Sequence, residues 1–205
     1  PPPPPTFFTT PTTAYEMLRS LVGSEMCIRD RKYNIPYLLD ACQAAGQMSI
    51  NVKKIECDFL SATGRKFLRG PRGTGFLYIK EKWLDTIEPV MIDHFGAPWV
   101  EKNVYELRED ARRFETWENS YALRAGLGEA INYAEKIGID LIHDRVQLLA
   151  GENRNLLAEI KKVQIRDIGM EQCGIISFSI EEFGIRIVFI DYSFTFLITR
   201  IDLLF

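Results

Sequence analysis

The residues with the clearest chemical potential are an acid and a lysine that each follow a short apolar run. Asp40 ends the run Tyr-Leu-Leu, and Gln43 follows it three residues later. Lys66 follows a second run, Phe-Leu-Ser-Ala, and stands 26 positions after Asp40. A glycine-rich turn, Gly-Pro-Arg-Gly-Thr-Gly, occupies residues 70–75. A carboxylate, an amide and a lysine beside a flexible turn are the groups needed to hold a reactive ring cofactor.

Pyridoxal phosphate (PLP) is the cofactor that would use all of these groups. Its pyridine nitrogen stays protonated beside a carboxylate, which is the role predicted for Asp40. Lys66 would hold the aldehyde as an imine (an aldimine) and later carry the substrate's α-proton. Gln43 can hydrogen-bond the phenolate oxygen. Thr63 and Arg65 can reach the phosphate, whose oxygens match the guanidinium fork.

Each of these signals is weak by itself. An isolated Asp40 is most often a helix cap or a turn residue, and a lone Lys66 is usually a solvated surface lysine. A glycine-rich turn is common in hairpins. The joint spacing of the three features is what favours the cofactor site.

The elements that must position these residues follow from hydrophobic patterning. Short apolar runs predict strands that end at Asp40 and strands over 58–62, 76–79 and 174–180. Apolar residues at helical spacing predict helices over 119–137 and 139–162. Residues 41–46, just after the first strand, can begin a helical turn. Strands mixed with helices indicate an α/β protein.

The stretch from Asp40 to Lys80 resembles the class V aminotransferase family, which includes cysteine desulfurases, selenocysteine lyases, isopenicillin N epimerase and kynureninase-like enzymes. The family pattern is Asp-x-x-Gln, a Cys-Asp-Phe strand, Ser/Thr-Gly-His-Lys and then Gly-Pro-x-Gly-x-Gly. The resemblance implies the roles given above, with Thr63 at the phosphate-binding Ser/Thr position. Arg65 stands where the family has histidine.

The resemblance also implies a fold and an assembly. The fold is a partial PLP fold of type I, in which an incomplete large-domain mixed or parallel sheet with helices leads into the start of a small C-terminal α+β domain. The full-length protein is expected to be a homodimer, since many relatives use the Thr of Phe-Glu-x-Gly-Thr to contact a partner subunit's cofactor. Here Glu118 stands at that Thr position, and its carboxylate would repel a phosphate. Thr116 is the alternative donor.

The two ends of the chain differ from its middle. Residues 13–31 resemble a translated DNA sequencing adapter, because the reading frame closes across an eight-base index, so residues 1–31 are predicted to be a non-native leader. We predict a partial PLP-binding large domain over 32–137 and the start of a small C-terminal domain over 138–182. Residues 183–205 are a hydrophobic tail, either out of frame or a strand pair. A fragment of this kind exposes a sheet edge, which predicts poor folding or aggregation.

Composition narrows the class of protein. The chain has 205 residues, 46% of them hydrophobic, and a net charge of −3, which gives no electrostatic reason to expect nucleic acid or an anionic membrane as a partner. It shows no secretory signal and no apolar run that could span a bilayer. The four cysteines lack metal-type spacing, so no metal site and a cytoplasmic location are predicted. Cys42 and Cys57 are predicted to be core residues.

The sequence therefore predicts a PLP-dependent enzyme that acts on a small amino-acid substrate through Lys66. The reaction would be transamination or C–S lyase chemistry of the desulfurase type, which makes the enzyme a transferase or a lyase. Epimerisation begins with the same loss of the α-proton, so Lys66 and Asp40 do not separate these reactions. One alternative is a truncated or chimeric reading frame with no activity of its own. Another is a noncatalytic module that holds an anion at residues 70–75.

Overall fold

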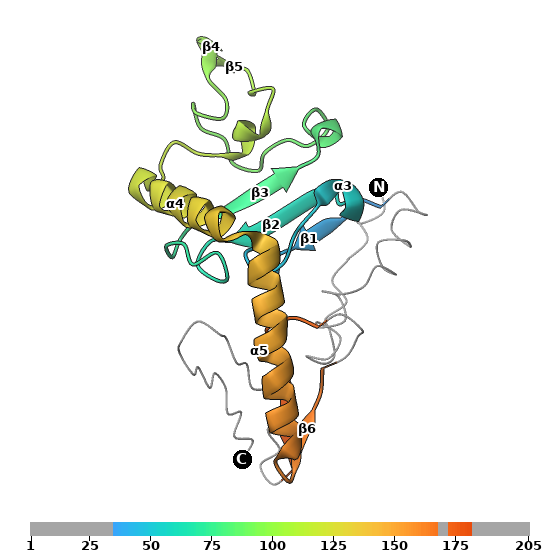
Figure 1. Ribbon diagram of the computed structural model, residues 1–205. Coiled ribbons are helices and arrows are strands. Elements are labelled where there is room, and N and C mark those ends of the chain that lie inside the picture. Colours follow the sequence, from blue (N-terminus) through green and yellow to red (C-terminus); the bar gives the residue numbers. More distant parts are fainter. Residues whose placement is uncertain (1–34, 168–171, 182–205) are drawn as a thin grey trace, which may run out of the picture.

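A three-stranded mixed sheet forms the centre of the computed structural model, which describes residues 35–167 and 172–181 (Figure 1). The strand order is β1 (Leu38–Asp40), β2 (Phe59–Thr63) and β3 (Gly75–Ile79). β1 runs parallel to β2, and β3 runs antiparallel to it. The predicted α/β character and these three strands are confirmed. The predicted leader and tail, residues 1–31 and 183–205, lie outside the described residues.

The connection from β1 to β2 contains a short helix that hydrophobic patterning did not predict. α3 (Val52–Ile55) begins after Asn51, whose side chain accepts hydrogen bonds from the backbone N–H groups of Lys53 and Lys54. The prediction that residues 41–46 begin a helix is wrong. The Ala45 N–H donates to the Ala41 carbonyl over 2.9 Å, but the chain then turns at Gly46 with φ of +96°.

One face of the sheet packs into the core. Leu60 and Ala62 of β2 are buried there, together with Leu127 of α4 (Tyr121–Ile137) and several small side chains. On the other face, Leu38 and Leu77 are 57% and 49% exposed. Parallel sheets are usually covered on both faces. The described part of the chain therefore leaves one apolar face of the sheet open.

Residues 81–119 form an excursion between β3 and α4. They contain two short 3-10 helices, η1 (Glu81–Trp83) and η2 (Ala111–Phe114), and a hairpin of β4 (Trp99–Glu101) with β5 (Val104–Tyr105). The buried Asp58, just before β2, accepts hydrogen bonds from the Trp83 indole and the Tyr37 backbone N–H. These bonds hold the start of the excursion against the sheet.

α5 (Ile139–Glu159) follows α4 after Gly138 and leads away from the sheet (Figure 1). An antiparallel pair, β6 (Val163–Ile165) and β7 (Phe178–Ile180), lies along α5. Both predicted helices are confirmed. None of the helices in the described ranges is long and apolar enough to cross a membrane.

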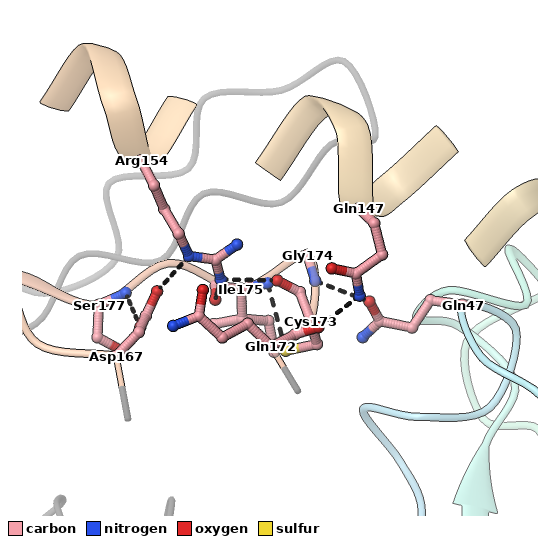
Figure 2. Close-up of polar contacts among 9 residues, drawn as sticks. All are labelled: Gln47, Gln147, Arg154, Asp167, Gln172, Cys173, Gly174, Ile175 and Ser177. Carbon is pink, nitrogen blue, oxygen red and sulfur yellow. Dashed lines mark hydrogen bonds and ion pairs between the residues drawn. The ribbon is translucent and has the colours of Figure 1, made fainter. Parts of the chain in front are cut away.

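The predicted strand over 174–180 is shorter in the structure, and β7 covers only its last three residues. Arg154 of α5 donates to the carbonyls of Cys173 and Ile175, at 2.8 and 3.0 Å. Asp167 accepts the Ser177 N–H over 2.7 Å and pairs with Arg154 over 2.7 Å (Figure 2). The side chains of Arg154 and Asp167 therefore hydrogen-bond the backbone groups that would pair with β6 if β7 were longer.

Gly46→Ala is expected to destabilise the fold. A Cβ at residue 46 would lie 2.5 Å from the backbone nitrogen of Leu68, in a left-handed conformation that strains side chains. Urea unfolding should show a loss of about 1–3 kcal/mol. The control is Gly128→Ala in α4, where a Cβ meets nothing within 4 Å and helix propensity predicts a gain of about 0.5–1 kcal/mol. An unchanged midpoint for Gly46→Ala would contradict this account of the turn.

Arg154→Met is expected to leave the Asp167 carboxylate, whose side chain is only 10% exposed, without its cation. Removing one partner of a buried ion pair costs about 3–5 kcal/mol. Arg112→Met is the matched control, because Arg112 pairs with Asp110 over 2.6 Å at the surface. Such exposed pairs contribute about 0–1 kcal/mol. Equal losses of unfolding free energy for the two variants in chemical denaturation would contradict a larger contribution from the buried pair.

Candidate active site

The parallel pairing of β1 with β2 brings the predicted residues to one edge of the sheet. Asp40, the last residue of β1, lies opposite Ser61 of β2, and Thr63 ends β2 at the same edge. The Ala41 N–H donates to the Ser61 carbonyl over 2.8 Å, which continues the pairing beyond β1. The chain segments that follow the two strands carry Gln43, Arg65 and Lys66. The carboxyl edge of parallel strands is where α/β proteins commonly bind ligands.

Asp40 is an exposed carboxylate with a locally stabilised charge. The Cys42 thiol hydrogen-bonds to it, and the Cys42 backbone N–H donates to its Oδ1 over 2.9 Å. These two bonds, with the positive charge of Lys66, hold the pKa of Asp40 below its usual value. An ionised carboxylate is the form that keeps a proton on a neighbouring pyridine nitrogen.

Cys42 lies between Asp40 and Thr63. Burial, together with the hydrogen bond and negative charge of Asp40, raises the pKa of the Cys42 thiol, so the thiol stays protonated and can donate. The Thr63 backbone also hydrogen-bonds to this sulfur. Cys57 is a core residue as predicted, whereas Cys42 is only half-buried and contacts two of the predicted site residues. The sequence signal for this was its place between Asp40 and Gln43.

Lys66 is half-buried in a loop that backbone hydrogen bonds hold closed. The Gly64 N–H donates to the Thr74 carbonyl, the Gly70 N–H to the Gly64 carbonyl, and the Arg69 N–H to the Lys66 carbonyl, each over 2.8 Å. Backbone hydrogen bonds therefore hold the loop at both ends and fix the backbone position of Lys66.

The glycine-rich turn at 70–75 positions this loop by close packing. A Cβ at Gly64 or Gly70 would lie 2.7 or 2.9 Å from Cδ1 of Leu127 in α4. A Cβ at Gly75 would lie 2.5 Å from the Ala62 carbonyl oxygen. The absence of side chains lets α4 and β2 approach the turn. Packing thus accounts for these glycines without an anion at the turn.

The groups at this edge fit pyridoxal phosphate by their chemistry. The ionised Asp40 suits a ring nitrogen, and the Lys66 amine suits an aldehyde. Thr63 offers a hydroxyl, whose Oγ1 lies 3.4 Å from the Thr74 carbonyl oxygen, and the exposed Arg65 offers a guanidinium. Gln43 is half-buried on the loop after β1 and offers an amide.

The segment that departs from the family pattern lies just before α4. Thr116 and Glu118 are both exposed, and the Trp117 N–H between them donates to the Asp93 carboxylate over 2.6 Å. Asp93 also accepts the Phe95 N–H over 2.8 Å. Asp93 therefore fixes the backbone from which Thr116 and Glu118 project.

Comparison with known proteins identifies the family. The Aminotransferase class-V family matches residues 24–188, more than half of the chain. The chain therefore belongs to the class-V aminotransferase family, and the resemblance predicted from the motifs is confirmed.

The relatives that it matches include cysteine desulfurases and a cystine C–S lyase. A probable cysteine desulfurase from Pyrococcus abyssi is 34% identical over 145 residues, covering 70% of this chain and 36% of that protein. The apo structure of the cysteine desulfurase from Thermococcus onnurineus NA1 superposes with a TM-score of 0.69 at 32% identity, covering 76% of this chain and 39% of the other. A C-DES mutant with glycine covalently linked to its PLP cofactor has a TM-score of 0.63 at 24% identity, over 68% and 37% of the two chains.

The chain spans about 36% of the length of the first of these relatives. Their common architecture confirms the predicted partial type I fold with its mixed sheet. The predicted cofactor, pyridoxal phosphate, is confirmed for the family to which the chain belongs.

Cys42→Ala is expected to raise the pKa of Asp40 toward its ordinary value, because the thiol hydrogen bond contributes most to lowering it. A carbon-detected NMR titration of the Asp40 carboxyl measures this shift. Since the folded-state pKa is lowered, Asp40 favours folding above its unfolded-state pKa, and this contribution is lost as pH falls through the folded-state value. Cys42→Ala should therefore move that loss to higher pH. Cys173→Ala is the control, and an equal Asp40 shift in both variants would contradict the assignment.

Proposed function

We propose that this chain carries the cofactor-binding edge of a PLP-dependent enzyme that cleaves the C–S bond of cysteine, as in cysteine desulfurases. The observation that carries the proposal is the parallel register of β1 and β2, which puts Asp40 and the Lys66 loop at one edge. The charge of Lys66 acts directly on Asp40. The names of the relatives support the substrate class, because several are described as probable cysteine desulfurases.

The side chains of this edge divide the work. When bound, pyridoxal phosphate supplies an electron-accepting ring that stabilises negative charge at the α-carbon of an amino-acid substrate. Lys66 would hold the aldehyde carbon of the cofactor with its amine, and the same amine would be the base for the proton on the substrate α-carbon. Asp40 would keep the ring nitrogen protonated with its ionised carboxylate. Thr63 and Arg65 would hold the phosphate, and the Gln43 amide would donate to the phenolate oxygen.

Cys173 has a structural role in this proposal. Its Sγ accepts the Ile175 N–H at 3.5 Å, within a segment whose carbonyls Arg154 binds. A desulfurase needs a thiolate that can take sulfur from the substrate, and the fixed position of Cys173 does not provide it. We further propose that the whole protein is a cytoplasmic homodimer, from the family resemblance and the sparse cysteines.

Lys66→Ala is expected to abolish the absorption band that appears when pyridoxal phosphate bonds to the protein. The band reports the covalent link between the lysine amine and the aldehyde carbon. Lys53→Ala is the matched control, because Lys53 is an exposed lysine of α3 and should leave the band unchanged. With cysteine as substrate and a thiol reductant present to reduce the bound persulfide, the full-length protein should release sulfide and leave alanine. A band that survives in Lys66→Ala would contradict the assignment, and conversion of the amino group without sulfide release would favour transamination.

A further inference from the structure

Gln47 is a buried amide that belongs to none of the roles described so far. It is 2% exposed and follows the turn at Gly46, seven residues after Asp40. Its Nε2 donates to the Gln43 backbone carbonyl over 2.5 Å. Its Oε1 accepts the Gly174 backbone N–H over 3.0 Å, across 127 positions of sequence (Figure 2). Both ends of one side chain are therefore used to join two distant segments.

The packing around Gly174 extends this connection to the lysine loop. A Cβ at Gly174 would lie 3.2 Å from Gln47 Oε1, 2.7 Å from Cγ1 of Val146 in α5 and 3.9 Å from Cε1 of Phe67. Phe67 is the residue after Lys66. Three segments thus meet around Gln47: the loop after β1, the Lys66 loop, and residues 172–177, which we call the anchored segment.

The anchored segment has further supports that come from α5. Gln147 Nε2 donates to the Gln172 carbonyl, and Arg154 donates to the carbonyls of Cys173 and Ile175 (Figure 2). These bonds fix the anchored segment to its own helix. Gln47, in contrast, reaches it from the loop that carries Asp40 and Gln43.

The two bonds of Gln47 constrain Gln43 as well as Gly174. Gln43 is held by its backbone carbonyl, so its side-chain amide projects from a backbone position that the Gln47 bond helps to fix. A buried N–H or carbonyl that loses its partner is strongly disfavoured. Movement of the loop after β1 therefore disturbs the Gly174 N–H, and movement of the anchored segment disturbs the loop.

We propose that Gln47 is a positioning residue that couples the cofactor-binding edge to the anchored segment. The coupling rests on the proposed function, since it takes pyridoxal phosphate as the ligand of that edge. A ligand that orders the loop after β1 also orders the Gly174 N–H through Gln47. By linkage, order at Gly174 strengthens the binding of that ligand to the same degree.

The test compares two glutamines that both hold the anchored segment. Gln47→Met removes a buried amide and Gln147→Met a half-buried amide of the same size. The hydrogen bond of Gln147 runs to the Gln172 carbonyl and not to the loop after β1. Titration of the full chain with pyridoxal phosphate should show weaker binding in Gln47→Met by roughly 5–100-fold, and a change below about twofold in Gln147→Met. Hydrogen exchange at the Gly174 N–H should slow on addition of pyridoxal phosphate in the wild-type chain and in Gln147→Met. It should not respond in Gln47→Met.

Equal loss of affinity in the two variants, or ligand-dependent protection of Gly174 that persists in Gln47→Met, would overturn the coupling. If Gln47→Met does not fold, Gln47→Glu replaces it, because a carboxylate still accepts the Gly174 N–H but cannot donate to the Gln43 carbonyl. It should bind pyridoxal phosphate more weakly, and wild-type affinity would overturn the coupling. A wild-type chain that binds no pyridoxal phosphate overturns the proposed function and the coupling together. Intact binding without a difference between the glutamines overturns the coupling alone.

Discussion

The parallel pairing of β1 with β2 is the constraint on which the site depends. An antiparallel arrangement would put Asp40 and the Lys66 loop at opposite ends of the sheet. A shift of register by one residue would move Leu60 and Ala62 from the core face to the open face. Burial of these apolar side chains therefore keeps Asp40 opposite Ser61, and the position of the acid relative to the lysine follows from core packing.

Glycines turn this sheet edge into a compact site. Gly46 lets the loop after β1 approach the backbone of residues 67–68, and Gly64 and Gly70 let Leu127 of α4 pack onto the Lys66 loop. Gly174 lets the anchored segment reach Gln47 in the same way. The polar side chains of the site are held in place by backbone segments that pack too closely to admit a Cβ. This close packing explains why glycines are frequent near Lys66.

Much of this arrangement could be predicted from local patterns. The strands that end at Asp40 and precede Lys66 are apolar runs with clear limits, and the two long helices have regular apolar spacing. The five predicted cofactor residues end or follow β1 and β2. Because these two strands are neighbours in the sheet, the residues lie at the same edge. Their individual roles remain proposals.

Other features depend on contacts that a local pattern does not contain. α3 is only four residues long and depends on the Asn51 cap. β7 is short because Arg154 and Asp167 bind the backbone before it. No local pattern marks Gln47, since its partner Gly174 is 127 positions away. The contact of Cys42 with Asp40 was hidden for a simpler reason, because an apolar context around a cysteine usually indicates the core.

The central claim is that Lys66, at the edge that Asp40 shares, is the amine that bonds pyridoxal phosphate. The most direct measurement is reduction of the protein–cofactor mixture with borohydride, which makes the bond permanent, followed by peptide mapping of every lysine. The account predicts that the added mass lies on Lys66 and that Asp40→Ala reduces the labelling. Labelling spread over surface lysines, or concentrated on a lysine other than Lys66, would contradict it.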